Sequence, residues 1–296
     1  MGIFRDNIKP ILKQKDILIR LIVINVVIFL ILITINITKL FGIDITETLI
    51  GYVAVPAKLE TLAIRFWTPF TYMFIHDYKN FFHILFNMLM LYWFGRIFLS
   101  YFSPKNLGSL YLLGGLAGAF IYIVAFNSIP LLIAMNHIPM VGASASVTAI
   151  IFAAAFYRPN QEITLFIFGR IKIIYIALFL FVLDFIGIGN LSNPGGHIAH
   201  IGGAITGYIF AKRYIQGHDI TKWINKLMDS IVDLFKTRPP KKMKIKHKRT
   251  ETEYEYNQRR HNDSEEIDRI LDKIKASGYT SLSNEEKKRL FDASNK

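Results

Sequence analysis

Four polar side chains stand inside segments of this 296-residue chain that are otherwise apolar: His83, Asn87, Ser144 and His200. A serine with a histidine beside it forms the nucleophile and general-base pair that amide hydrolysis requires. His83 and Asn87 are spaced i and i+4, so a helix would place both on one face. The sequence therefore offers the parts of a hydrolytic site, provided that one fold brings them together.

The composition indicates a membrane protein. Hydrophobic residues make up 52% of the chain and charged residues 19%, below the roughly 25% usual for soluble domains. Apolar runs of about 18 residues or more, long enough to cross a hydrocarbon core, recur over the first two thirds. An unpaired polar group in hydrocarbon is costly, so polar residues inside such runs need a reason. Cysteine is absent, which excludes a cysteine nucleophile and disulfides.

We predict six membrane-spanning helices, over residues 17–37, 81–99, 107–126, 142–157, 172–188 and 198–213. The N-terminus, the turns 96–105 and 158–172 and the chain after Lys212 are basic, whereas loops 127–140 and 189–197 contain no Lys or Arg. Basic loops stay on the cytoplasmic side. We therefore expect a multi-pass protein of the cell (cytoplasmic) membrane with both termini in the cytoplasm.

The long 38–80 loop is expected to lie half-embedded in the membrane interface. Its apolar stretches are too short to span, and its aromatic residues Phe66, Trp67 and Phe70 favour the headgroup level.

Three of the four polar residues are predicted to share one depth in the membrane. Ser144, His83 and His200 lie fourteen, thirteen and twelve residues before the basic residue that ends their span on the inner side. At about 1.5 Å per residue these distances place all three about 20 Å above the inner boundary. They would then lie about 10 Å below the outer face of a hydrocarbon core of about 30 Å.

The residues around Ser144 and His200 favour a close approach of their helices. Ser144 begins a span too short to cross, so its helix must start below the surface, where free backbone N–H groups could stabilise an oxyanion. Gly142 allows a tight turn before it. Gly203 and Gly207 follow His200 at i+3 and i+7, and small residues let helices pack closely.

These segments resemble the signatures of rhomboid intramembrane proteases. The resemblance rests on His83-Ile84-Leu85-Phe86-Asn87, on Gly142-Ala143-Ser144, and on Ala199-His200-Ile201-Gly202-Gly203 with Gly207. It covers roughly residues 17–215. It implies an all-α membrane protein with a six-transmembrane-helix rhomboid bundle, to which the helical pattern of the tail adds a small helical C-terminal cytoplasmic appendage.

The resemblance also implies an activity and roles for the residues. Ser144 and His200 would form a catalytic dyad without an Asp, with Ser144 attacking the scissile carbonyl and His200 taking its proton. His83, Asn87 and the Ser144 backbone N–H would hold the oxyanion. The implied substrates are transmembrane segments of membrane proteins, cut near the outer face, with no cofactor and no metal.

Two residues depart from the family pattern beside this site. Ala145 follows the serine where the family often has glycine, and Thr148 replaces a tyrosine that packs on the histidine in many members. In the 38–80 loop Trp67 matches a family tryptophan, but Thr68 stands where an arginine usually follows. The resemblance therefore leaves open what orients His200.

Four regions are expected: a basic cytoplasmic N-terminus (1–16), the protease domain (17–215), a basic cytoplasmic linker (216–261) and a small helical hairpin (262–296). The linker contains a run of lysines after Pro239-Pro240, which would rest on anionic lipid of the bilayer. We do not expect nucleic-acid binding, because the run lacks interleaved aromatic residues.

Two other functions are compatible with a membrane bundle of this kind. A rhomboid-like protein without activity could bind membrane clients, although such relatives lack the nucleophile or the base. A small transporter could use His137, His197 and His200 as ligands, but Asp184 is the only acid in a predicted span. A zinc protease is disfavoured because no His-Glu-x-x-His motif is present.

Overall fold

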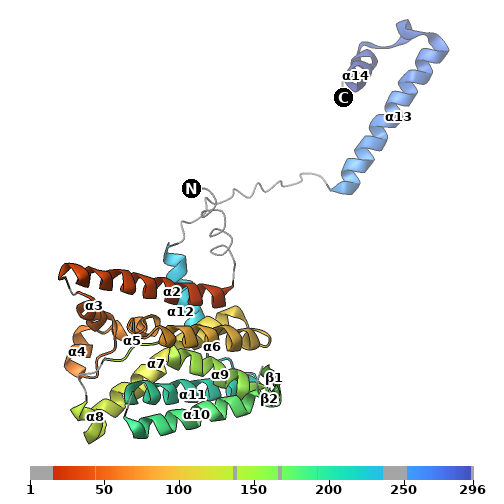
Figure 1. Cartoon of the computed structure of the whole chain (residues 1–296). Coiled ribbons are helices and arrows are strands. Elements are labelled where there is room, and N and C mark those ends of the chain that lie inside the picture. The colour runs from red at the N-terminus through yellow and green to blue at the C-terminus, as the bar shows by residue number, and fades with distance from the viewer. Residues whose placement is uncertain are drawn as a thin grey trace. The chain divides into compact units, whose positions relative to one another are not determined.

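The computed structural model describes residues 16–43, 45–135, 139–165, 169–191, 193–235 and 252–294 (Figure 1). The chain divides into two compact units, residues 1–236 and 237–296. The first unit is a helical bundle that contains all four polar residues of interest, and the second is a small helical unit.

Six long helices build the bundle: α2 (Ile17–Asn36), α6 (Phe81–Leu99), α7 (Pro104–Ser128), α9 (Ser144–Tyr157), α10 (Ile173–Asn190) and α11 (Pro194–Ile215). They follow the six predicted spans closely, and α7 is longer than expected at both ends. By length and hydropathy α2, α6, α7 and α10 could each cross a membrane. Helix α9 is apolar but has only 14 residues, and α11 carries two histidines and five glycines.

Side-chain caps mark where most of these helices begin. Asp16, Asn80, Ser103 and Asn193 cap α2, α6, α7 and α11 by accepting a hydrogen bond from a backbone N–H of the first turn. Helices α9 and α10 have no such cap, and the N-cap residue of α9 is Ala143. The first backbone N–H groups of α9 can therefore donate hydrogen bonds to another partner.

Helix α9 lies at the centre of the bundle and is buried over most of its length. Glycines on its neighbours make this possible. A Cβ at Gly203 of α11 would collide with the carbonyl oxygen of Ala145, and one at Gly207 with that of Ala149. These contacts place Gly203 and Gly207 against the fourth predicted span, where only glycine fits.

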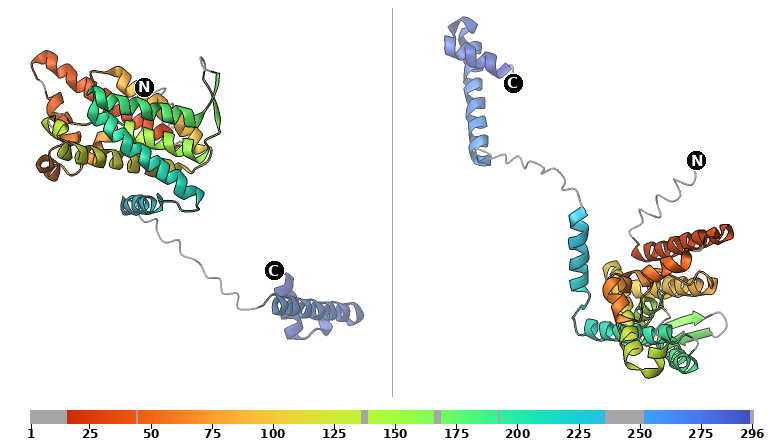
Figure 2. Two further views of the ribbon diagram at one scale, coloured as in Figure 1. Left: turned by 90° about the horizontal axis from the view of Figure 1, so that it is seen from below. Right: turned by 90° about the vertical axis from the view of Figure 1, so that its left-hand side faces the viewer.

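Helix α10 packs on the bundle through a narrow stripe. Its buried residues are Ile173, Ala177 and Asp184, which lie on one face of the helix, and the rest is largely exposed. Figure 2 shows α10 and α11 from two further sides, next to each other at one edge of the bundle.

Short elements gather at the two ends of the bundle (Figure 1). One end holds α3 (Thr46–Val53), α4 (Leu59–Ile64) and α8 (Pro130–Ala134), and the other holds the antiparallel hairpin of β1 (Glu162–Leu165) and β2 (Gly169–Lys172). The remaining short elements are η1 (Ile37–Phe41), α5 (Thr68–Thr71) and η2 (Tyr72–Phe74). The end with the β-hairpin belongs to the basic 158–172 turn. The end with α8 belongs to the 127–140 loop, which contains no Lys or Arg.

The 38–80 loop is ordered by backbone contacts. Val55 pairs with Met140 through two hydrogen bonds, and the indole N–H of Trp67 donates to the Tyr52 carbonyl over 2.9 Å. Phe66, Trp67 and Phe70 are exposed. An interfacial position for this loop stays a prediction that these exposed rings favour.

The region predicted as a linker contains more helix than expected. Helix α12 (Lys222–Phe235) packs on α7, where the Ser109 hydroxyl and Asn225 are 2.6 Å apart. Helix α13 (Glu253–Ser277) begins nine residues before residue 262, because Thr252 and Glu255 form a capping box. The lysine run that follows Pro239-Pro240 lies outside the described residues.

The second unit is the predicted hairpin with a longer first helix. After α13, η3 (Tyr279–Ser281) leads into α14 (Asn284–Ser294). Ser283 and Glu286 form a capping box, and Lys273 forms an ion pair of 2.9 Å with Glu286. Ile270 is buried in its small core.

Candidate active site

All four predicted polar residues line one cavity of about 710 Å³. His83 and Asn87 reach it from α6, Ser144 from the start of α9 and His200 from α11. Polar residues outside the six long helices also border it, among them Glu47, Asp77, Lys79, Asn80 and Asn193. The cavity therefore joins residues from three predicted spans to a polar border that water can wet.

Ser144 is the first residue of α9, directly after a strained turn. Gly142 has φ of +126°, a backbone conformation that side chains rarely adopt, and its N–H donates to the Tyr72 carbonyl over 3.1 Å. The turn presents the partly buried serine at the cavity. Because no side chain caps α9, its first N–H groups remain near the Ser144 hydroxyl as donors for a negatively charged oxygen.

His83 directs one ring nitrogen toward this turn. Its Nδ1 atom accepts a hydrogen bond from the Asp77 backbone N–H over 3.3 Å. A neutral ring that accepts at Nδ1 carries its proton on Nε2. That Nε2 atom would lie 3.0 Å from a Cβ built on Gly142, so the donor faces the segment that holds Ser144.

His76 supports the His83 ring from the adjoining loop. The two rings meet edge to face with centroids 5.2 Å apart. Burial lowers the pKa of His76 to about 3, so its imidazole is neutral at physiological pH. The spacing of His76 and His83 does not predict this contact, because the contact depends on the path of the loop between them.

Asn87 lies one helical turn after His83 and is buried. Its side-chain amide nitrogen donates to the His83 carbonyl over 2.7 Å. An amide group has two N–H donors, so one remains for a ligand in the cavity.

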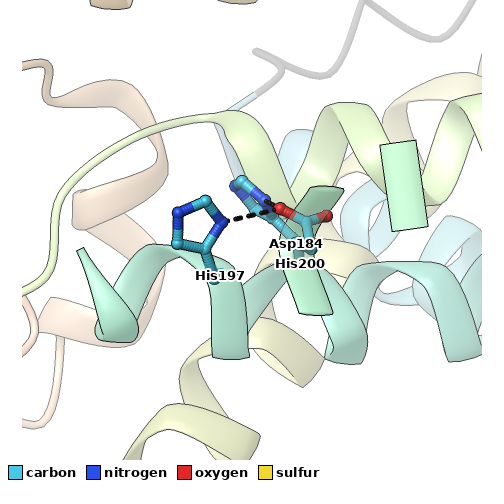
Figure 3. Close-up of side chains that lie close together, drawn as sticks. All are labelled: Asp184, His197 and His200. Carbon is cyan, nitrogen blue, oxygen red and sulfur yellow. Dashed lines mark hydrogen bonds and ion pairs between the residues drawn. The ribbon is translucent and has the colours of Figure 1, made fainter. Parts of the chain in front are cut away.

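His200 has a partner that sequence reasoning missed. Its Nδ1 atom lies 2.6 Å from Oδ1 of Asp184 on α10, and Nδ1 of His197 lies 2.9 Å from the same oxygen (Figure 3). The family resemblance implies a dyad without an acid, whereas here a buried carboxylate contacts the histidine. A partner for Asp184 could have been predicted from the sequence, because an ionisable residue in a membrane span is costly unless it is paired.

Ser144 and His200 line the same cavity but are not directly bonded. Among the hydrogen bonds of the described residues, none joins the Ser144 hydroxyl to His200. Catalytic hydrogen bonds are often long before substrate binds, so this separation is compatible with a nucleophile and its base.

Asp184, His197 and His200 are also the one group of possible metal ligands found among the described residues. Their ligand atoms lie within 4.8 Å of one another. Both imidazole nitrogens, however, are at hydrogen-bonding distance from the carboxylate. Hydrogen bonds therefore account for the arrangement without an ion.

Comparisons with known proteins agree with this architecture. The rhomboid domain family model matches residues 63–217, and a family of unknown function, DUF6576, matches residues 250–296. The first match covers over half of the chain and includes all four site residues. The chain belongs to the rhomboid family and is a multi-pass membrane protein.

A curated relative points to the same family. RHOMBOID-like protein 12, mitochondrial, from Arabidopsis thaliana is 32% identical over 151 residues. The aligned part is 46% of this chain and 43% of that protein, so the chain spans less than half of the relative's length.

Proposed function

We propose that this protein is an intramembrane serine endopeptidase that cleaves transmembrane segments of other membrane proteins. The observation that carries the proposal is the single cavity lined by Ser144, His200, His83 and Asn87 within a membrane bundle. Intramembrane polar residues are expensive, and their convergence on one cavity is typical of a functional site.

The proposed reaction begins with attack of the Ser144 hydroxyl oxygen on the scissile carbonyl carbon. His200 takes the hydroxyl proton at Nε2, and the carbonyl oxygen becomes an oxyanion. The intermediate collapses when the C–N bond breaks and His200 gives its proton to the leaving amine. Water then attacks the acyl ester with His200 as base, which releases the carboxylic acid and restores Ser144.

The oxyanion would be stabilised by three kinds of donor. These are the backbone N–H at Ser144, the Nε2–H of His83 and the second amide N–H of Asn87. Such donors act strongly in a site that excludes most water, because they are already oriented when the charge develops.

Removal of either side-chain donor is expected to slow the reaction without abolishing it. We expect His83→Ala and Asn87→Ala each to lower turnover by about 10- to 1000-fold, as loss of one oxyanion donor does in other hydrolases. The measurement is the initial rate on a fluorogenic transmembrane substrate in proteoliposomes. Phe86→Ala, on the same helix and also at the cavity, is the matched control for removing a side chain that donates no hydrogen bond. Unchanged rates for both donor variants would refute their role.

We also propose the cell membrane as the location, with both termini in the cytoplasm. The basic ends of the spans support this orientation, because Lys and Arg are retained on the inner side. The basic linker would then bind anionic lipid of the inner leaflet. Protease protection of a C-terminal tag in sealed right-side-out vesicles tests the orientation, and digestion of that tag would contradict it.

The alternative function is that of a catalytically inactive rhomboid-like protein that binds membrane clients, and the activity test distinguishes the two. This alternative would leave the same cavity and the same family membership, and it would show no Ser144-dependent cleavage of any transmembrane substrate.

A further inference from the structure

We propose that Asp184 is a positioning residue for the catalytic histidine, so that the site works as a serine–histidine–aspartate arrangement assembled inside the membrane. This inference rests on the proposed function. It adds a residue that the family resemblance does not supply, since the resemblance implies a serine–histidine pair alone.

The placement of Asp184 is the first argument. It is 8% exposed on a helix whose outward residues are large and apolar, such as Phe185 and Ile186. A carboxylate in that setting is costly unless it is paired. Its described partners are the two histidines of α11, which lie one helical turn apart and present Nδ1 to the same oxygen.

The hydrogen bond fixes which nitrogen of His200 carries a proton. An ionised carboxylate only accepts, so Nδ1 of His200 must be the donor over the 2.6 Å contact. A neutral His200 then has its lone pair on Nε2. That is the atom which must take the proton of Ser144, and a histidine held in this tautomer is ready to do so.

The charge balance favours the same role. When His200 takes the serine proton it becomes an imidazolium, which in a membrane would be strongly disfavoured without a counter-charge. Asp184 supplies that charge at hydrogen-bonding distance. The carboxylate therefore stabilises the charged form of the base at the step where it appears.

His197 holds the carboxylate from the second side. Its Nδ1 donates to the same Oδ1 atom over 2.9 Å. Its ring packs where Gly187 leaves room on α10, since a Cβ at Gly187 would overlap the His197 ring. Gly187 follows Asp184 by three residues, so both face α11. Two donors on one oxygen restrict the carboxylate to one orientation.

Thr148 removes one restraint on His200 that the family resemblance implies. In many rhomboid proteases a tyrosine one turn after the nucleophile packs on the histidine, and threonine has no ring to do this. Asp184 contacts the same histidine at Nδ1 over 2.6 Å.

The experiment compares Asp184→Asn, Asp184→Leu and Ser144→Ala in proteoliposomes with the fluorogenic transmembrane substrate. We expect Asp184→Asn to lower kcat by about 100- to 10,000-fold with KM nearly unchanged, because an amide can stabilise the wrong tautomer. Asp184→Leu should be as inactive while keeping the thermal stability of the bundle. A kcat for Asp184→Asn near that of the wild type, with Ser144→Ala inactive, would overturn the inference and leave the proposed function standing. An inactive wild type would instead contradict the proposed function.

A second measurement decides the case in which the Asp184 variants fail to fold. Nitrogen NMR shifts of histidine-labelled wild type, with His200 assigned by its loss in His200→Ala, report the tautomer. A proton on Nδ1 supports the inference, and a proton on Nε2 overturns it.

A matched glycine pair separates the His197 contact from general damage to α10. Gly187→Ala should displace His197 and lower kcat by about tenfold, less than the roughly 100- to 10,000-fold contribution of a general base, because His197 acts only through Asp184. Gly189→Ala should leave kcat unchanged, because a Cβ there meets nothing within 4 Å. Equal rates for the two variants would contradict the part assigned to His197.

Discussion

Replacement of Ser144 by alanine is expected to reduce cleavage of a transmembrane substrate by at least about 1000-fold, to the background of empty vesicles. The loss should be this large because the serine oxygen forms the bond to the scissile carbon, and no other group in the cavity replaces it. The measurement is the initial cleavage rate in proteoliposomes at equal protein content.

Ser146→Ala is the matched control for this variant. Ser146 lies on the same helix two residues later, and its buried hydroxyl has no hydrogen-bond partner among the described residues. Loss of this hydroxyl should leave cleavage near the wild-type rate and should not lower stability, since it removes an unsatisfied polar group. Activity that survives Ser144→Ala but not Ser146→Ala would assign the nucleophile to Ser146.

Gly203→Val is expected to prevent correct assembly of the bundle. A Cβ at Gly203 would collide with the Ala145 carbonyl oxygen, and Ala145 follows the nucleophile directly. The backbone of α9 cannot move away easily because the helix is enclosed by its neighbours. We expect a destabilisation of about 3 kcal/mol or more, at the upper end for overpacking, together with loss of activity.

Thermal unfolding in detergent checks this effect, again with Gly189→Ala as a control for a glycine with open space around it. A Gly203→Val protein with wild-type stability and activity would contradict the close contact of α11 and α9. Stability kept without activity would show that the contact matters for the position of Ser144 rather than for folding.

The spans and the helix contacts could be predicted from sequence because each rests on a local rule. Apolar length predicted α2, α6, α7 and α10, and the short apolar span that ends at Tyr157 indicated that Ser144 begins a helix. The spacing of Gly203 and Gly207 predicted the buried face of α11. Each of these features depends on one segment and its immediate composition.

The parts that could not be predicted depend on how separate segments face each other. Asp184 was visible as an acid in a span, but its contact with His200 depends on the rotation of α10 about its axis, which a largely apolar helix does not reveal. The donor direction of His83 likewise depends on the backbone N–H of Asp77, which the loop brings to its ring. Helix α12 was missed because the linker was inferred from Pro239-Pro240 and the lysine run after it, although apolar residues recur at helical spacing through Lys222–Phe235.

These contacts change the expected site from two residues to a connected set. In the proposed mechanism, Asp184 and His197 orient the base, the uncapped start of α9 supplies backbone donors, and His83 and Asn87 add side-chain donors. The residues come from four helices that pack around α9 or against α11, so the bundle positions all of them.

Covalent capture of the nucleophile tests the central claim most directly. The protein in proteoliposomes would be treated with a serine-directed fluorophosphonate, and the modified peptide would be identified by mass spectrometry in the wild type, Ser144→Ala and His200→Ala. A serine protease of this design should carry one adduct, on Ser144, which disappears in Ser144→Ala and forms far more slowly in His200→Ala. Wild type that carries no adduct on Ser144, or labels equally fast without His200, would contradict the account.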